Sequence, residues 1–186
     1  IEMAKRCGIK REIPPYASSS LGTTEVTPLE LTAAYTTFAN LGARVEPYFI
    51  EEIRLGNLPL EKNEPKITQV LSPQIAYLIT YVLEGVVDRG TAAEANKIPL
   101  PIAGKTGTTV EYTDAWFIGF TPTYTIGVWV GNDQKVKIGS KMTGARAALP
   151  AFEEIANYIS EKGLENIKEF TIPRGINFVE IDRLTG

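Results

Sequence analysis

Residues 102–130 read IAGKTGTTVEYTDAWFIGFTPTYTIGVWV. Three short apolar segments alternate with turns in this stretch: Ile102 to Thr109, Ala115 to Phe120 and Tyr124 to Val130. The link Thr121-Pro122-Thr123 is too short for a crossover helix, so the two segments that it joins should run antiparallel. The stretch therefore predicts three consecutive antiparallel strands.

Helix signals lie on both sides of these strands. Thr27-Pro28-Leu29-Glu30 is a capping box with proline at the first helical position, and Gly42 stands where a helix C-cap glycine belongs. Ser72-Pro73 repeats the signal of a cap followed by proline. Apolar residues at steps of three and four predict buried-face helices over residues 28–41, 73–87 and 146–162.

The remaining segments are expected to be extended. Val45 to Leu55 is rich in β-branched and aromatic residues and precedes the turn Gly56-Asn57, which predicts a strand or a short hairpin. Phe170 to Ile181 predicts a loosely attached extended segment. Gly119 and Gly127 interrupt predicted strands where another element can pack closely. Together the elements indicate an α+β fold in which helices cover an antiparallel sheet.

Composition excludes several classes of function. The 186 residues are 44% hydrophobic with a net charge of -3, and they contain no basic run that would suggest nucleic-acid binding. No apolar run approaches the roughly 20 residues of a membrane helix. The chain has no histidine, which removes the commonest general base and metal ligand, so we expect neither a Ser-His-Asp site nor a metal or other cofactor. The single cysteine, Cys7, fits a small buried thiol.

The feature most suggestive of chemistry is Lys105-Thr106-Gly107-Thr108-Thr109. Strand alternation puts Lys105, Gly107 and Thr109 on one face and both Thr106 and Thr108 on the other. Two hydroxyls on one face can donate jointly to a carboxylate, and a nearby ammonium supplies positive potential. A glycine lets another backbone or a substrate approach, and a strand edge can bind an extended peptide.

The segment Lys105 to Thr109 has two other interpretations. The first is a Thr-rich exposed strand with a solvated lysine, which has no function. The second is a phosphate-binding loop, because Gly104-Lys105-Thr106 matches the end of that motif. The first glycine of the motif would have to stand at position 99, which is Pro99, and no helix pattern follows.

Several segments in the same order resemble the class A penicillin-binding proteins, which cross-link peptidoglycan. Lys105-Thr106-Gly107-Thr108-Thr109 is similar to the third active-site motif of that family. The other similar segments are Leu21-Gly22, Glu25 to Leu31, Phe38 to Gly42, Gly90-Thr91-Ala92, Asp114 to Pro122 and Gly131-Asn132-Asp133. The resemblance extends over residues 21–152 and is weaker in the tail.

The resemblance implies the penicillin-binding and serine β-lactamase-like transpeptidase fold and a serine acyl-enzyme mechanism. In that mechanism the serine of Ser-x-x-Lys attacks a D-Ala-D-Ala bond, and an amine of a second stem peptide takes the acyl group. This chain departs from the pattern, because none of its six serines has lysine three residues later or asparagine two residues later. We therefore expect residues 1–186 to be the C-terminal part of one transpeptidase domain, with the nucleophile upstream of Ile1. The chain has no initial methionine, which also suggests a piece of a longer polypeptide.

By resemblance, Lys105 keeps the site electropositive and helps proton movement. The hydroxyls of Thr106 and Thr108 bind the carboxylate of the substrate or of a β-lactam, Gly107 lines that site, and Thr109 is a rim contact. The backbone N–H of Thr108 is one oxyanion-hole donor. Two tryptophans are expected to pack on the sheet, and three carboxylates are expected to lie in turns: Trp116, Trp129, Glu111, Asp114 and Asp133.

Two alternative functions stay open on the sequence alone. One is a β-lactamase or D,D-carboxypeptidase relative, and the other is a non-catalytic peptidoglycan-binding module. Under the main hypothesis the partners are stem peptides, β-lactam antibiotics and the upstream half of the domain, and no nucleic acid. The resemblance also implies an extracytoplasmic site in the bacterial envelope and a membrane anchor outside these residues.

Overall fold

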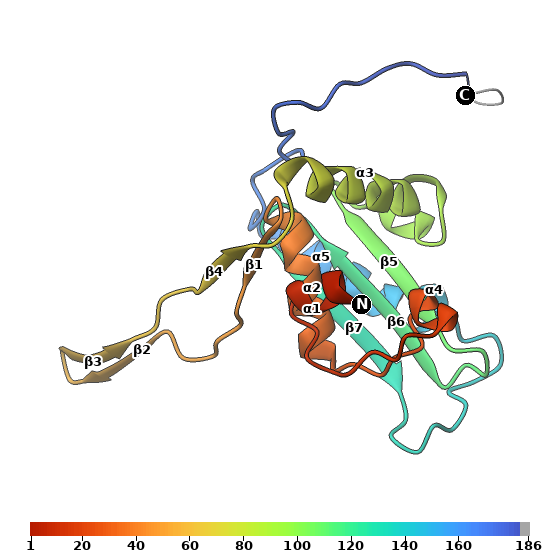
Figure 1. Cartoon of the computed structure of the whole chain (residues 1–186), viewed down its shortest axis with the longest axis horizontal. Coiled ribbons are helices and arrows are strands. Elements are labelled where there is room, and N and C mark those ends of the chain that lie inside the picture. Colours follow the sequence, from red (N-terminus) through yellow and green to blue (C-terminus); the bar gives the residue numbers. More distant parts are fainter. Residues whose placement is uncertain (183–186) are drawn as a thin grey trace.

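The computed structural model describes residues 1–182. Its centre is an antiparallel sheet of β5 (Ala103–Thr108), β6 (Asp114–Phe120) and β7 (Thr125–Gly131), in that order. Helices lie on both faces of the sheet (Figure 1), which confirms the predicted strands and the α+β class. The helical elements are α1 (Glu2–Arg6), η1 (Ala17–Leu21), α2 (Pro28–Ala39), α3 (Pro73–Arg89), η2 (Ala93–Lys97), α4 (Gly144–Ala147) and α5 (Leu149–Glu161).

Cross-strand pairing assigns the side chains of the sheet to its two faces. Phe117 and Phe120 are fully buried and, three positions apart on β6, point to opposite faces. On one face the ring of Phe117 lies 4.7 Å from that of Phe152 on α5. On the other face Phe120 packs against Tyr35 of α2, with ring centroids 6.5 Å apart. The sheet is therefore the middle layer between α5 and α2.

The two strand glycines lie at the closest approaches of these helices, as predicted. A Cβ atom on Gly119 would lie 2.7 Å from Cζ of Phe152 in α5. A Cβ atom on Gly127 would overlap the side chain of Thr32 in α2. Glycine is required at both positions because a side chain would push the helical layer away from the sheet.

Helix α2 begins with the predicted capping box. The Thr27 hydroxyl accepts from the backbone N–H of Glu30 at 3.2 Å, and the Glu30 carboxylate accepts from that of Thr27 at 3.3 Å. The helix ends two residues earlier than predicted. Gly42 donates its N–H to the Thr37 carbonyl at 2.7 Å, but the first left-handed residue is Leu41, with φ of 49°. The C-terminal turn therefore starts one residue before the glycine.

The other two predicted helices are also present, with changed boundaries. Ser72 caps α3 by accepting from the N–H of Ile75 at 3.3 Å, and α3 extends to Arg89. The single helix predicted over residues 146–162 is instead divided at Ala148 into α4 and α5. Pro150 explains the division, because proline has no N–H to continue the hydrogen-bond ladder from α4.

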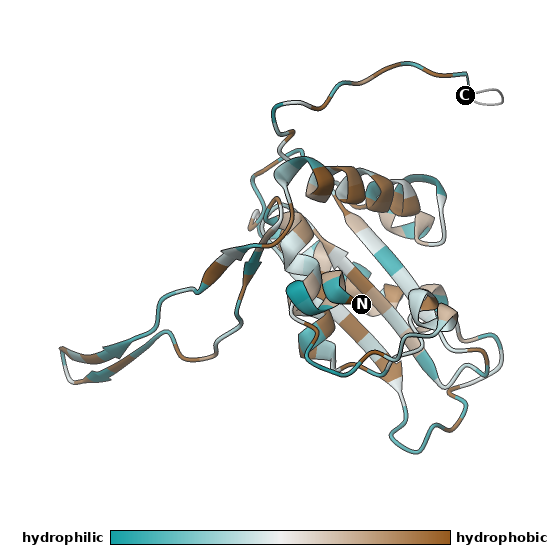
Figure 2. Ribbon diagram, viewed as in Figure 1, coloured by the Kyte–Doolittle hydropathy of each residue, from teal (hydrophilic) through white to brown (hydrophobic). Residues whose placement is uncertain are grey.

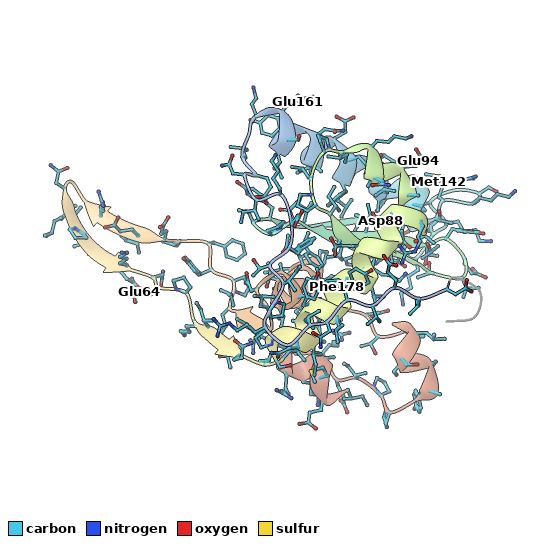
Figure 3. The ribbon with its side chains drawn as sticks, turned by 90° about the horizontal axis from the view of Figure 1, so that it is seen from above. Glu64, Asp88, Glu94, Met142, Glu161 and Phe178 are labelled. Carbon is cyan, nitrogen blue, oxygen red and sulfur yellow. The ribbon has the colours of Figure 1, made fainter. Side chains whose placement is uncertain are left out.

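A narrow arm projects from the body between α2 and α3 (Figure 1). Its strands form two antiparallel pairs, β1 (Ala43–Val45) with β4 (Ile67–Gln69) and β2 (Glu52–Leu55) with β3 (Leu58–Lys62). The predicted hairpin is confirmed, and Gly56 supplies the positive φ, 59°, of its turn. Figure 3 shows the same arm from above, with Glu64 on it well away from the helices.

The C-terminal segment is extended as predicted, but part of it is tightly held. Phe170 is only 8% exposed and packs against Phe120 of the sheet, with ring centroids 5.6 Å apart. Farther along, Phe178 contacts the edges of Tyr77 and Tyr81 on α3 (Figure 3). The prediction of loose attachment is therefore wrong at Phe170, because an aromatic side chain completes the core there.

Sequence reasoning missed a buried carboxylate, Glu165, which binds the link between β6 and β7. Glu165 is 4% exposed and accepts hydrogen bonds from the hydroxyls of Thr121 at 2.7 Å and Thr123 at 2.9 Å. It also accepts from the backbone N–H groups of Thr123 and Ile167. Burial alone would raise the pKa of Glu165, but these donors outweigh it and lower the pKa.

Hydropathy follows this packing. Figure 2 shows hydrophobic colour along much of β6 and β7, whereas β5 is pale with a hydrophilic band.

No helix within residues 1–182 is both long enough and apolar enough to cross a bilayer. Cys7 is a buried thiol, as predicted, and this burial raises its pKa.

Candidate active site

Strand β5 forms one outer edge of the central sheet, where β6 is its one strand partner within the described chain. The N–H of Thr109 donates to the Asp114 carbonyl of β6 at 3.1 Å. Backbone groups alternate in direction along an antiparallel strand, so the N–H of Thr108 and the carbonyl of Thr106 point to the outer edge. An approaching ligand therefore meets a backbone donor at Thr108.

Lys105 brings its positive charge to the same edge. It lies opposite Ile118 in the register, and its exposed ammonium group donates to the Thr106 carbonyl at 2.8 Å. Since this carbonyl is one of the outward-pointing groups, the Lys105 ammonium lies beside the edge instead of extending straight into solvent. The outward N–H of Thr108 and this cation therefore serve the same open side of β5.

Thr106 and Thr108 share the face opposite to that of Lys105, as alternation predicts. Their cross-strand neighbours are Phe117 and Ala115, which are both fully buried. Both hydroxyls lie at the border between the covered sheet and the open edge, because Thr106 is half-buried and Thr108 is exposed. The register thus places two hydroxyls two residues apart on one side of the strand.

Each of these hydroxyls is held by a different element. Thr106 Oγ1 lies 2.8 Å from Thr91 Oγ1, in the turn after α3. Thr108 Oγ1 accepts a hydrogen bond of 2.9 Å from the backbone N–H of Gly144, the first residue of α4. These two partners were not singled out as site residues from the sequence. Gly90-Thr91-Ala92 gave a signal as a family-like segment, whereas nothing in the sequence marked Gly144.

Glycines let α4 approach the strand closely. A Cβ atom on Gly144 would lie 2.7 Å from the Gly107 carbonyl oxygen and still closer to that of Trp116. Gly107 and Trp116 are paired across β5 and β6, so Gly144 lies directly over this pair. A Cβ atom on Gly107 would itself lie 3.2 Å from Cβ of Trp116. Gly144 therefore maintains the close packing of α4 beside Thr108, whereas Gly107 leaves room for Trp116 on the opposite face of the sheet.

Thr109 has a role in the turn between β5 and β6. Its hydroxyl accepts from the backbone N–H groups of Thr113 at 2.9 Å and Asp114 at 3.0 Å. Asp114 in turn accepts from the indole N–H of Trp129 at 2.9 Å. The prediction that the two tryptophans pack on the sheet agrees with the structure, since the ring centroids of Trp116 and Trp129 lie 6.2 Å apart.

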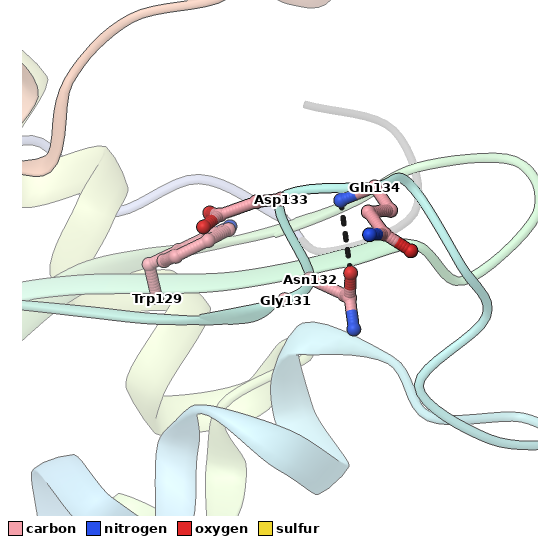
Figure 4. Close-up of a pocket in the computed structure, with 5 residues that line it drawn as sticks. All are labelled: Trp129, Gly131, Asn132, Asp133 and Gln134. Carbon is pink, nitrogen blue, oxygen red and sulfur yellow. Dashed lines mark hydrogen bonds between the residues drawn. The ribbon is translucent and has the colours of Figure 1, made fainter.

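A pocket of about 420 Å³ lies at the end of β7, on the other side of β6 from β5 (Figure 4). Its lining includes Trp129 and the turn Gly131 to Gln134. The Asn132 side-chain oxygen accepts from the backbone N–H of Gln134 at 2.9 Å, which is a common way to stabilise a turn. None of the predicted site residues lines this pocket, so we do not place it in the candidate site.

Three of the serines have structural partners. Ser19 and Ser20 donate to the carbonyls of Pro14 and Ala17, and Ser72 caps α3. Within residues 1–182 no group of three or more His, Cys, Asp or Glu residues is arranged to hold a metal ion. The groups that β5 presents are an ammonium, hydroxyls and a backbone N–H, which act by charge and hydrogen bonding.

Comparison with known proteins connects this geometry with one family. Residues 12–157 match the family model described as the penicillin binding protein transpeptidase domain. Penicillin-binding protein 1A of Aquifex aeolicus is 46% identical over 151 residues, which cover 81% of this chain and 21% of the relative. Penicillin-binding protein 1A of Rickettsia typhi is 35% identical, with 100% of this chain and 26% of the relative covered. The chain thus spans about a quarter of these relatives.

A solved structure agrees with the sequence comparison. The crystal structure of penicillin-binding protein 1A from Haemophilus influenzae matches 99% of this chain and 33% of its own chain, with a TM-score of 0.85 and 28% identity. PonA1 of Mycobacterium tuberculosis has a TM-score of 0.73 at 19% identity, which shows the shared fold. By the match of its sequence over most of its length, this chain belongs to the family of penicillin-binding protein transpeptidase domains.

Proposed function

We propose that this chain supplies the Lys-Thr-Gly strand of a D,D-transpeptidase that cross-links peptidoglycan stem peptides through a serine acyl-enzyme. The observation that carries the proposal is the convergence at the edge of β5. There the Lys105 ammonium, the outward N–H of Thr108 and the tethered hydroxyls of Thr106 and Thr108 lie around one open side of the strand. The family match and the relatives favour this function over a β-lactamase, a D,D-carboxypeptidase or a non-catalytic binding module.

In the proposed reaction a serine outside this chain attacks the carbonyl carbon of the D-Ala-D-Ala peptide bond. The carbonyl oxygen becomes negatively charged in the tetrahedral intermediate and accepts a hydrogen bond from the N–H of Thr108. The Lys105 charge assists transfer of the serine proton to the D-Ala nitrogen, the peptide C–N bond breaks, and D-Ala leaves as the amine while the acyl group stays on the serine. An amine of a second stem peptide then attacks the acyl-enzyme and releases the serine.

The two threonine hydroxyls account for recognition of the terminal carboxylate. Thr108 accepts its hydrogen bond from Gly144, so the proton of its own hydroxyl is available to a ligand. Thr106 can donate in the same way when Thr91 donates to it. Gly107 lines the strand between them and lets a substrate backbone approach, and Thr109 stays a proposed rim contact near the turn.

The proposed partners follow from this assignment. They are peptidoglycan stem peptides, β-lactams that imitate the donor peptide, and an upstream part of the same transpeptidase domain that carries the serine. In this proposal residues 1–186 are the C-terminal part of that domain. The substrate implies an extracytoplasmic location, with a membrane anchor provided outside these residues.

Labelling with a fluorescent penicillin tests the proposal. In the longer protein that contains this chain, Lys105→Ala should slow acylation by at least about a hundredfold, the size of a general acid-base contribution. Lys97→Ala is a matched control, because Lys97 is an exposed lysine on η2 that pairs with Glu94 and lies outside the proposed site. Labelling of Lys105→Ala at the full rate would contradict the role of Lys105.

A further inference from the structure

Thr91 contacts the hydroxyl of Thr106 from outside the Lys-Thr-Gly strand. It lies in the segment Gly90-Thr91-Ala92, between the end of α3 and η2. Its hydroxyl oxygen lies 2.8 Å from that of Thr106 across a sequence separation of 15 residues. The contact therefore depends on how α3 and β5 are placed side by side (Figure 1).

The backbone on both sides of Thr91 is fixed. The N–H groups of Gly90 and Ala92 both donate to the Val86 carbonyl, at 3.1 Å each. A Cβ atom on Gly90 would lie 2.8 Å from Cα of Val86, so a side chain does not fit there. Ala92 is fully buried in the core that contains Phe117. Thr91 is therefore an exposed side chain on a rigid backbone, which is the arrangement of a preorganised contact.

The direction of the hydrogen bond decides what Thr91 can do. A threonine hydroxyl has one proton, so while the Thr91–Thr106 bond is kept, Thr106 can donate to a ligand carboxylate only when the Thr91 hydroxyl donates to Thr106. The result is a chain of hydrogen bonds from Thr91 through Thr106 to the carboxylate. Each donor in such a chain polarises the next and strengthens its bond. Without Thr91, the Thr106 hydroxyl can rotate or donate to other acceptors.

We propose that Thr91 is a positioning residue, which orients and polarises the Thr106 hydroxyl for recognition of the substrate carboxylate. The proposal rests on the proposed function, because it needs Thr106 to contact that carboxylate. It assigns no contact between Thr91 and the reacting atoms. The segment Gly90-Thr91-Ala92 then orients a site residue in addition to connecting α3 with η2.

The test compares acylation rates of the longer protein with a penicillin and with its methyl ester. Thr91→Val keeps the β-branched shape and deletes the hydroxyl, so acylation by the free acid should slow by about two- to tenfold, the factor for one neutral hydrogen bond. Acylation by the ester should stay at its wild-type rate. Thr91→Ser retains the hydroxyl and should restore most of the rate with the acid. Equal losses on acid and ester, or no loss on either, would overturn the proposal.

A double-mutant cycle with Thr106→Val separates a positioning role from a general structural one. If Thr91 acts through the Thr106 hydroxyl, then Thr91→Val should cause no further loss when Thr106 is already valine. Losses that add fully in the double variant would show that Thr91 acts independently. If Thr106→Val alone does not change the ratio of acid to ester rates, the assignment of Thr106 in the proposed function fails, and the role of Thr91 fails with it. A lack of acylation in the wild type would instead reject the proposed function itself.

Discussion

The backbone N–H of Gly144 donates a hydrogen bond of 2.9 Å to the hydroxyl oxygen of Thr108. This bond joins α4 to the edge strand of the sheet at the residue whose N–H and hydroxyl both take part in the proposed chemistry. Because the donor is a backbone group at the start of a helix packed over Gly107 and Trp116, it is fixed by the fold. The position of α4 is therefore part of the geometry of the site.

Gly144→Ala should damage both stability and acylation. The added Cβ would lie 2.7 Å from the Gly107 carbonyl oxygen, so α4 must shift away and the bond to Thr108 lengthens. Overpacking of this kind costs about 1–3 kcal/mol. We expect a lower melting temperature and slower acylation by penicillin. Gly85→Ala is the control, since a Cβ there meets only the flexible Arg89 side chain and helix propensity should raise stability by up to about 1 kcal/mol.

Two substitutions at Thr108 test the role of its hydroxyl. Thr108→Val deletes the hydroxyl and leaves the Gly144 N–H without its acceptor, whereas Thr108→Ser keeps both. Loss of a hydrogen bond to a charged group should weaken recognition of the carboxylate by about 1.5–3 kcal/mol in the valine variant only. Acylation rates with penicillin and its methyl ester measure this effect. An equal loss on the ester would show that the hydroxyl does not contact the carboxylate.

The N–H of Thr108 is tested by proline, which removes the N–H and the hydroxyl together, so Thr108→Val, which lacks the hydroxyl alone, is the reference variant. Thr108→Pro deletes the outward backbone donor, and loss of one oxyanion-hole donor should cost about a hundred- to a thousandfold in acylation rate. Measured against Thr108→Val, the further loss should be equal on the ester and the acid, because the oxyanion forms in both. A matched melting temperature for Thr108→Pro and wild type is required to exclude damage to β5. An acylation rate close to that of wild type in a folded variant would contradict the oxyanion role.

Local signals in the sequence predicted most of the fold. The capping box at Thr27 and the cap at Ser72 fixed two helix starts, because both act within a few residues. Alternation along residues 103–108 also gave the correct face for Lys105 and for the two threonines. The boundaries of β5, β6 and β7 were within one residue because turns interrupt the apolar pattern, whereas the strand or hairpin predicted over Val45 to Leu55 is a strand only at Val45, where β1 ends, and at Glu52–Leu55.

The features that sequence reasoning missed depend on contacts between distant segments. The bonds from Thr91 to Thr106 and from Gly144 to Thr108 span 15 and 36 positions. No local pattern encodes such distances. Phe170 was assigned to a loose tail because it has no periodic neighbours, although it packs on Phe120. Propensity and capping describe single elements, whereas these contacts are set by how the layers pack.

Glu165→Gln should destabilise the end of the sheet. The wild-type carboxylate accepts four hydrogen bonds from Thr121, Thr123 and Ile167, and glutamine replaces one acceptor oxygen with an NH₂ group that faces donors. One unsatisfied buried donor costs about 1–3 kcal/mol. Because the folded protein lowers the pKa of Glu165, its stabilisation is present above the normal pKa and is lost as the pH falls through the lower value. Urea titrations at pH 7 and in acid should show a difference between the variants at pH 7 that shrinks in acid.

The last prediction concerns Glu84 on α3, whose pKa the fold raises to about 7. Burial is the main cause, and the charges of Asp88 and Glu169 add repulsion. The folded state therefore holds a proton that the unfolded state, with a pKa near 4.5, has already released. Stability should fall as the pH rises from about 4.5 to about 7 and then level off, because in this window the folded state binds more protons. The half-buried position reduces the effect to about 1 kcal/mol once solvent screening is allowed for.

Glu84→Gln removes this titration and should flatten the dependence of stability on pH between about 4.5 and 7. The variant should be more stable than wild type above pH 7, because glutamine carries no charge that has to be buried. Asp88→Asn is an informative second variant, since loss of its repulsion lowers the pKa of Glu84 and should move the fall in stability to lower pH. Melting temperatures from pH 4 to pH 8 in the longer protein give the measurement. A parallel pH profile for Glu84→Gln and wild type would show that another group is responsible, and a wild-type profile that rises across this window would contradict the sign of the prediction.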